Sequence, residues 1–81
     1  MDVRRRLSLN LQRLRREKGW SQEDLAEESG LHRTYISGIE RCKKNPTITV
    51  VDRLAVALEA PMGALLEAPP KKAGAKARRT K

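Results

Sequence analysis

The chain has 81 residues, a formal net charge of +8 at pH 7 and a single cysteine, Cys42. A chain this short supports one small core, and a domain of roughly 60 residues buries only about 60% of its unfolded surface. One cysteine excludes an internal disulfide, and with the single histidine it makes no zinc ligand set, so we expect no metal and no cofactor. No run approaches the roughly 18 apolar residues of a membrane span, and residues 1–6 lack the apolar segment of a signal peptide, so we expect a cytoplasmic protein without membrane contact.

The positive charge is concentrated at one end of the chain. Residues 68–81 contain six Lys and Arg residues and no acid, which leaves +2 for residues 1–67. Proline, glycine and alanine make up most of the rest of this segment, so it has little to bury. We expect a folded domain over residues 1–67 and a disordered basic tail over residues 68–81. The tail is available to nucleic-acid phosphates, or it serves only to keep the protein in solution.

The first predicted helix covers residues 4–18 and ends at Gly19. Its inner stripe, at helical spacing, is expected to consist of Val3, Leu7, Leu11 and Leu14. A second helix begins after Ser21, because Ser21 and Asp24 have the spacing of a capping box. Gly30 can take a positive φ and end that helix in a sharp turn.

A third helix follows the turn and is amphipathic. Tyr35, Ile36 and Ile39 share one stripe, which is expected to hold the helix in the core. The opposite stripe is polar and open to a partner; it contains Arg33, Thr34, Ser37 and Gly38. Two short helices joined by a glycine-containing turn form the layout of a helix-turn-helix that reads DNA.

The remaining chain completes an all-α fold. Asn45 and Pro46 predict a loop, after which Thr47 can cap a helix over residues 48–59. The residues that this helix is expected to bury are Ile48, Val51, Leu54, Ala55 and Leu58. Pro61 suits the start of a fifth helix over residues 62–67.

Several motifs in the right order resemble the Xre/Cro family of bacterial and phage regulators. They are residues 20–26 (WSQEDLA), residues 35–41 (YISGIER) and the pair Asn45-Pro46, and the resemblance covers about residues 7–66. It implies a five-helix, lambda-repressor-like DNA-binding domain. Residues 33–41 are also similar to the controller proteins of restriction-modification systems.

The resemblance places the third helix in the major groove. Arg33 is the leading base reader, because a guanidinium pairs bidentately with guanine O6 and N7. Thr34 and Ser37 offer hydroxyl groups, and Gly38 lets the helix approach the DNA closely. Phosphate contacts are expected from Gln22, His32, Tyr35, Arg41, Lys43 and Lys44. Each of the three basic residues could instead be an ordinary solvated charge, and Tyr35 could instead serve in packing.

Two positions depart from the family pattern, and one pair follows it. His32 stands where a small hydroxyl residue usually caps the recognition helix. Cys42 replaces the usual glycine, which makes a positive φ there costlier. Arg15 and Glu40 align with a family ion pair, so we expect a partly buried salt bridge that orients the recognition helix.

The predicted function is sequence-specific transcriptional regulation by a homodimer on a palindromic site in double-stranded DNA. A restriction-modification controller or a phage-type repressor is expected, with contact to RNA polymerase where the site lies beside a promoter. The dimer surface is expected at Met62, Leu65 and Leu66. Two other readings stay open, an antitoxin-like protein-interaction module and a non-specific nucleoid binder. No motif indicates an enzyme or a small-molecule ligand.

Overall fold

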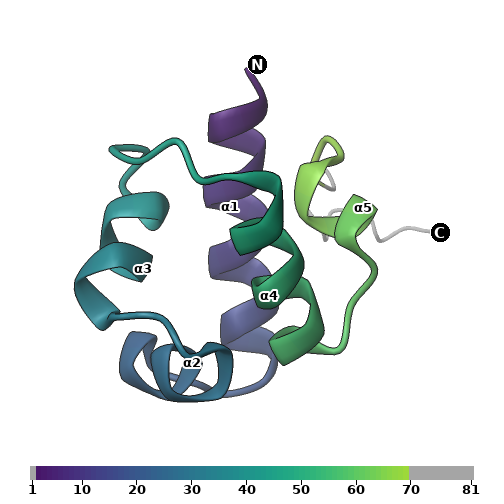
Figure 1. The fold of residues 1–81 in the computed structure, drawn as a ribbon. Coiled ribbons are helices and arrows are strands. Elements are labelled where there is room, and N and C mark those ends of the chain that lie inside the picture. The colour runs from purple at the N-terminus through teal and green to yellow at the C-terminus, as the bar shows by residue number, and fades with distance from the viewer. Residues whose placement is uncertain (1, 70–81) are drawn as a thin grey trace, which may run out of the picture.

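The computed structural model describes residues 2–69, which form five α-helices and no β-strand. In chain order the helices are α1 (Val3–Glu17), α2 (Gln22–Ser29), α3 (Arg33–Glu40), α4 (Ile48–Leu58) and α5 (Met62–Leu66). Figure 1 shows α2, α3 and α4 arranged around α1, with α5 beside α1 and α4. The predicted all-α, five-helix class is confirmed. Most of the predicted basic tail, residues 70–81, lies outside the described residues.

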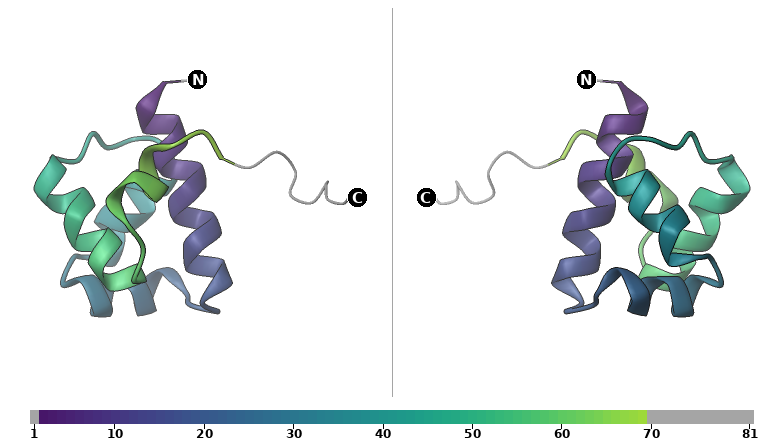
Figure 2. Two further views of the ribbon diagram at one scale, coloured as in Figure 1. Left: turned by 90° about the vertical axis from the view of Figure 1, so that its right-hand side faces the viewer. Right: turned by 90° about the vertical axis from the view of Figure 1, so that its left-hand side faces the viewer.

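Helix α1 begins one residue earlier than expected, because Asp2 caps it. The Asp2 carboxylate accepts hydrogen bonds from the amides of Arg4 at 2.8 Å and Arg5 at 3.2 Å. The helix ends as expected, with Gly19 in the left-handed region at φ 73°. The two views of Figure 2 show α1 running the length of the domain, with the N-terminus at one end and α2 at the other.

The capping box and the left-handed glycine turn that were predicted for the helix-turn-helix are both present. Ser21 accepts a hydrogen bond from the amide of Asp24, and the Asp24 carboxylate accepts one from the amide of Ser21, which completes the capping box. Gly30 adopts φ 75° and ends α2, and the amides of Gly30 and Leu31 both donate to the Ala26 carbonyl. The turn therefore has the conformation that glycine adopts without steric cost.

The core lies where the inner stripes of all five helices meet. Helix α1 packs against α3 and α5, α2 packs against α3 and α4, and α4 packs against α5. The large apolar side chains that are fully buried are Leu11, Leu25, Ile36, Ile39, Leu54 and Leu65. Every helix contributes at least one of them, and α3 is held through Ile36 and Ile39 in its packing against α1 and α2.

Two residues expected in the core are exposed. Ile48 is 74% exposed and Val3 is 47% exposed. Both lie in the first turn of their helix, where the inner stripe extends past the elements that cover the rest of it. With Leu7 and Pro46 they line a shallow apolar groove of about 240 Å³ at this end of the domain. The apolar spacing placed Val3 and Ile48 on the correct face of their helices, but the core does not extend as far as these two residues.

Polar side chains of α1 hold the end of α5. Asn10 Nδ2 donates to the carbonyls of Leu65 at 3.0 Å and Glu67 at 2.7 Å, and Arg6 Nε donates to the Leu66 carbonyl at 2.6 Å. Carbonyl groups at a helix C-terminus lack partners within the helix, so these donors satisfy them. Leu65 is 0% exposed within the single protomer. The expectation that Leu65 contributes to a dimer surface is therefore wrong, because its side chain already fills the core.

Candidate nucleic-acid interface

The outward face of α3 presents polar side chains at its N-terminal end. Arg33 and Thr34 are exposed, and Ser37, one turn later, is half-buried. His32 takes the capping position with extended backbone, but its side chain makes no capping hydrogen bond. The first turn of α3 is thus accessible, and its amides are the kind of donor that binds anions.

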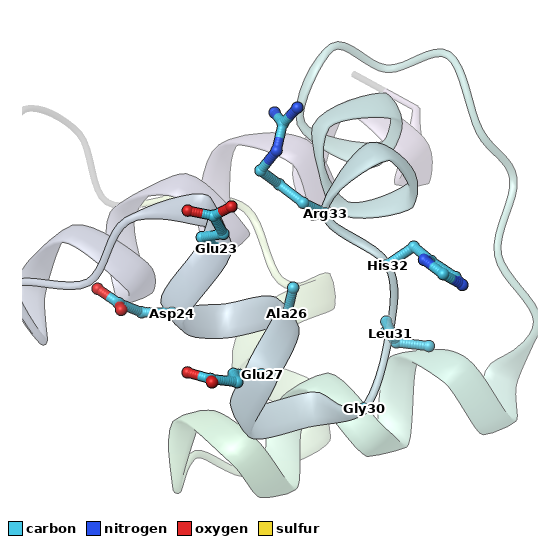
Figure 3. Close-up of a pocket in the computed structure, with 8 residues that line it drawn as sticks. All are labelled: Glu23, Asp24, Ala26, Glu27, Gly30, Leu31, His32 and Arg33. Carbon is cyan, nitrogen blue, oxygen red and sulfur yellow. The ribbon is translucent and has the colours of Figure 1, made fainter.

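Negative charge lies on one side of this helix end. Figure 3 shows Arg33 and His32 at the edge of an open hollow of about 600 Å³, with Glu23, Asp24 and Glu27 on its α2 side. Three carboxylates repel phosphate, whereas the loop that follows α3 carries cationic, exposed side chains at Arg41, Lys43 and Lys44. The charge distribution therefore favours a DNA backbone near the C-terminal end of α3.

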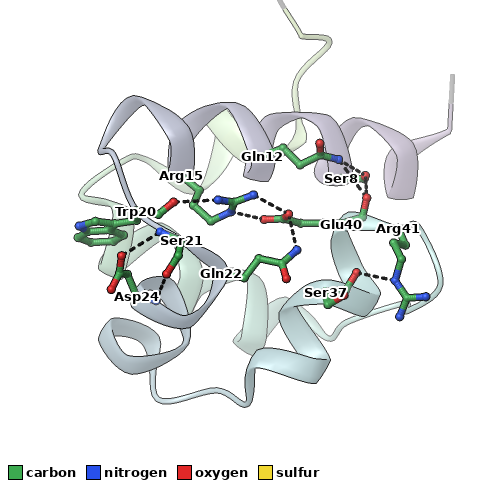
Figure 4. Close-up of polar contacts among 10 residues, drawn as sticks. All are labelled: Ser8, Gln12, Arg15, Trp20, Ser21, Gln22, Asp24, Ser37, Glu40 and Arg41. Carbon is green, nitrogen blue, oxygen red and sulfur yellow. Dashed lines mark hydrogen bonds and ion pairs between the residues drawn. The ribbon is translucent and has the colours of Figure 1, made fainter.

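A buried ion pair ties α3 to α1. Arg15 Nε lies 2.7 Å from Glu40 Oε2, Arg15 Nη2 donates to Glu40 Oε1 at 3.0 Å, and the two side chains are only 9% and 5% exposed. The hydrogen bonds to Glu40 raise the pKa of Arg15, against the opposing effect of burial. Arg15 Nη1 also donates to the Trp20 carbonyl at 2.8 Å, so the pair is joined to the start of the helix-turn-helix (Figure 4).

Gln22 belongs to the same network. Its Nε2 donates to Glu40 Oε1 at 3.0 Å, and Figure 4 shows the side chain pointing from α2 toward Glu40. Gln22 was expected to contact a phosphate. In this structure one N–H of its side-chain amide links α2 to the end of α3, and its backbone amide lies at the first position of α2.

Two further residues in this network were not anticipated from the sequence. Ser8 Oγ donates to the Glu40 carbonyl at 2.6 Å, and Gln12 Nε2 donates to the same oxygen at 3.0 Å. These side chains of α1 hold the C-terminal carbonyl of α3, a group without a partner in its own helix. The available signal was the position of Ser8, directly after Leu7 on the inner half of an amphipathic helix.

The loop after α3 folds back on the helix. The Cys42 amide donates to the Ile39 carbonyl at 2.9 Å and the Lys43 amide to the Gly38 carbonyl at 2.8 Å, which is the Schellman pattern of a helix end. Cys42 adopts the left-handed conformation at φ 62°. This is the position at which the family usually has glycine, and a positive φ is costlier for cysteine, as expected from the sequence.

Gly38 does not form an open part of the surface. It is buried, and a Cβ atom built on it would lie 2.7 Å from Lys44 Cγ and 3.2 Å from Lys44 Cε. The stem of Lys44 therefore crosses α3 at this position, and its ammonium lies 5.8 Å from the centroid of the half-buried Tyr35 ring. The expectation that Gly38 is open to close approach by DNA is wrong in this structure, because the chain's own lysine covers it.

Fold and site together define a helix-turn-helix domain with an accessible recognition helix. A family profile described as Helix-turn-helix matches residues 11–65. The chain belongs to this helix-turn-helix family. Within residues 2–69, no helix is long and apolar enough to cross a membrane.

Relatives of known name place the chain among transcriptional regulators. It is 44% identical over 57 residues to a hypothetical transcription factor of Neisseria meningitidis serogroup B, an alignment that covers 70% of this chain and 54% of that protein. The chain thus spans about half the length of that relative. It is 44% identical over 66 residues to control protein C.SmaI of Serratia marcescens, covering 82% of this chain and 79% of the relative.

A solved structure shows the same fold on DNA. The restriction-modification controller protein C.Esp1396I, solved as a tetramer in complex with its natural 35 base-pair operator, matches with a TM-score of 0.72 and 36% sequence identity. The match covers 83% of this chain and 99% of that one. These comparisons identify sequence-specific DNA binding and transcriptional regulation as the function of the family to which the chain belongs.

Proposed function

We propose that this protein is a transcriptional regulator of the restriction-modification controller type, which binds a palindromic operator as a homodimer. The observation that carries the proposal is the accessible N-terminal half of α3, which presents Arg33 and Thr34 on a helix whose C-terminal end is held by the contacts of Glu40 with Arg15, Ser8 and Gln12. Ser37 follows one turn later. A recognition helix in the major groove contacts base edges with these positions, and Arg33 is suited to guanine.

Phosphate contacts are assigned to two regions. Arg41, Lys43 and Lys44 follow the C-terminal end of α3, and Tyr35 lies in the first turn of α3, 5.8 Å from the Lys44 ammonium. The backbone amide of Gln22 and the side chain of His32 lie at the N-terminal ends of α2 and α3. Groups on both sides of the recognition helix fix its register on the duplex. The dimer surface is assigned to Met62 and Leu66. Their side chains are half-buried beside the core, so part of their apolar surface is exposed and a second protomer could bury it.

Contact with RNA polymerase belongs to the same proposal. A dimer bound beside a promoter would contact the polymerase and activate transcription, whereas a dimer bound over the promoter would repress it. In both cases the protein acts on chromosomal or phage DNA in the bacterial cytoplasm.

In-vitro selection tests the proposal. Random duplex DNA is selected with the purified protein at about 150 mM salt, at which non-specific binding is weak. The expected result is a palindrome whose half-site centres are about 10 base pairs apart, one helical turn. Enrichment of no motif by the folded protein would contradict the proposal. Arg33→Ala serves as the comparison, because loss of the base reader should relax the preference at one position of each half-site.

A further inference from the structure

The contact between Gly38 and Lys44 has a role beyond packing. We propose that Gly38 is a positioning residue: the missing side chain leaves a notch in α3 through which the Lys44 stem passes, so that the Lys44 ammonium is held over the Tyr35 ring as a preformed phosphate ligand. The inference rests on the proposed function, since the phosphate belongs to the operator.

The position of Lys44 follows from the helix end. The Schellman bonds of Cys42 and Lys43 reverse the chain directly after α3, so that Lys44 is directed back toward the helix. The residue on α3 that faces it is Gly38, one turn after Tyr35 along the same side of the helix. The stem therefore runs across Gly38, and its ammonium reaches the Tyr35 ring at 5.8 Å from the centroid.

A side chain at position 38 would prevent this path. An added Cβ would lie 2.7 Å from Lys44 Cγ, closer than real Cβ contacts come, and within 3.5 Å of Cδ. Because the obstructing atoms belong to a flexible side chain and not to backbone, the lysine stem would move and α3 would stay in place. Alanine is also the better helix former, so the fold itself has no reason to weaken.

Holding the ammonium in advance matters for binding. A free lysine side chain loses rotamer freedom when it is ordered on a phosphate, and a stem already seated in a notch loses less. The Tyr35 ring contributes a weak attraction for the cation, which favours the same position without neutralising its charge. Lys44 therefore presents its positive charge beside Tyr35, in the first turn of α3.

The experiment compares operator binding across a range of salt concentrations in the wild-type protein and four variants. Each neutralised phosphate contributes about 0.9 to the slope of log affinity against log salt, or about 3.5-fold over a fourfold salt range. Lys44→Met removes the charge and keeps the stem, and Gly38→Ala keeps the charge and blocks the stem. Lys44→Met should lower the slope by about 0.9 per protomer. Gly38→Ala should weaken binding at every salt concentration and keep the slope, because the displaced lysine keeps its charge, and in the Lys44→Met background Gly38→Ala should cause no further loss. The control is Gly63→Ala, since a Cβ on Gly63, also a helix residue, meets nothing within 4 Å.

The outcomes separate the possibilities. A Gly38→Ala protein with wild-type affinity, or with an affinity loss that persists in the Lys44→Met background, would overturn the positioning role, because a direct clash with DNA does not depend on Lys44. An unchanged slope in Lys44→Met would overturn the phosphate ligand. Wild-type protein that binds no specific duplex would overturn the proposed function, and the inference with it.

A measurement without DNA checks the geometry directly. In the wild-type protein the methylene protons next to the Lys44 ammonium lie near the Tyr35 ring, so their NMR signals should be shifted by the ring current. Gly38→Ala should return these signals to their random-coil positions while the melting temperature is kept. Retained ring-current shifts in Gly38→Ala would contradict the notch.

Discussion

Replacing Arg15 by alanine should destabilise the domain strongly, because it leaves the Glu40 carboxylate buried without its cation. Glu40 would keep only the amide of Gln22, at 3.0 Å, and the Trp20 carbonyl would lose its 2.8 Å bond as well. Removing one partner of a buried pair costs about 3 to 5 kcal/mol. Since about 1 kcal/mol shifts the melting temperature of a domain this small by roughly 4 to 8 °C, the loss should be about 12 °C or more.

The matched control is Arg13→Ala on the same helix. Arg13 pairs with Glu17 at 3.3 Å and donates to Asn10 Oδ1 at 3.3 Å, but the Glu17 side chain is 61% exposed, so the two contacts together should contribute only about 1 to 2 kcal/mol. Thermal unfolding followed by circular dichroism measures both variants under one condition. A shift for Arg15→Ala no larger than that for Arg13→Ala would refute the reasoning. The double replacement of Arg15 and Glu40 by methionine should be more stable than Arg15→Ala, because no charge is left buried alone.

Three further predictions concern stability. Cys42→Gly should stabilise the domain by about 1 kcal/mol by relieving the positive φ, and a lower melting temperature would contradict this. Leu65→Ala should cost about 2 to 5 kcal/mol whereas Ile48→Ala should cost less than about 0.5 kcal/mol, and equal losses in urea unfolding would contradict the assigned burial. The amides of Arg5 and Arg4 lower the pKa of Asp2 below its ordinary value of 3.8, so its ionised form stabilises the fold at neutral pH and this contribution is lost as pH falls below that value. In Asp2→Asn the melting temperature should therefore fall less steeply at acid pH than in the wild-type protein. An equally steep fall in both proteins would contradict the cap.

The local structure could be predicted because its signals are local. The Ser21–Asp24 capping box, the left-handed turn at Gly30 and the Thr47 cap each depend on residues within one turn of the chain. The spacing of apolar residues assigned the inner face of each helix. It could not show where that face stops being covered, which is why Ile48 was expected in the core and lies at its edge.

The site was less accessible to sequence reasoning because its contacts join distant segments. Ser8 and Gln12 are 32 and 28 residues from Glu40 along the chain, and no local pattern relates them. The pairing of Arg15 with Glu40 could be expected from the family resemblance alone. The covering of Gly38 by Lys44 depends on the conformation of the loop after α3, in which Cys42 takes a left-handed backbone conformation. A non-glycine residue rarely takes this conformation, so the loop could not be predicted from the sequence.

Methylation interference is the most direct test of the claim that α3 reads bases in the major groove. A selected operator is methylated lightly at guanine N7, the group that Arg33 is assigned to contact, and the bound and free fractions are compared. We predict that methylation of one guanine in each half-site blocks binding of the wild-type protein, and that Arg33→Ala loses this sensitivity at that guanine alone. Binding that ignores N7 methylation throughout the operator, or an interference pattern identical in Arg33→Ala, would contradict the account.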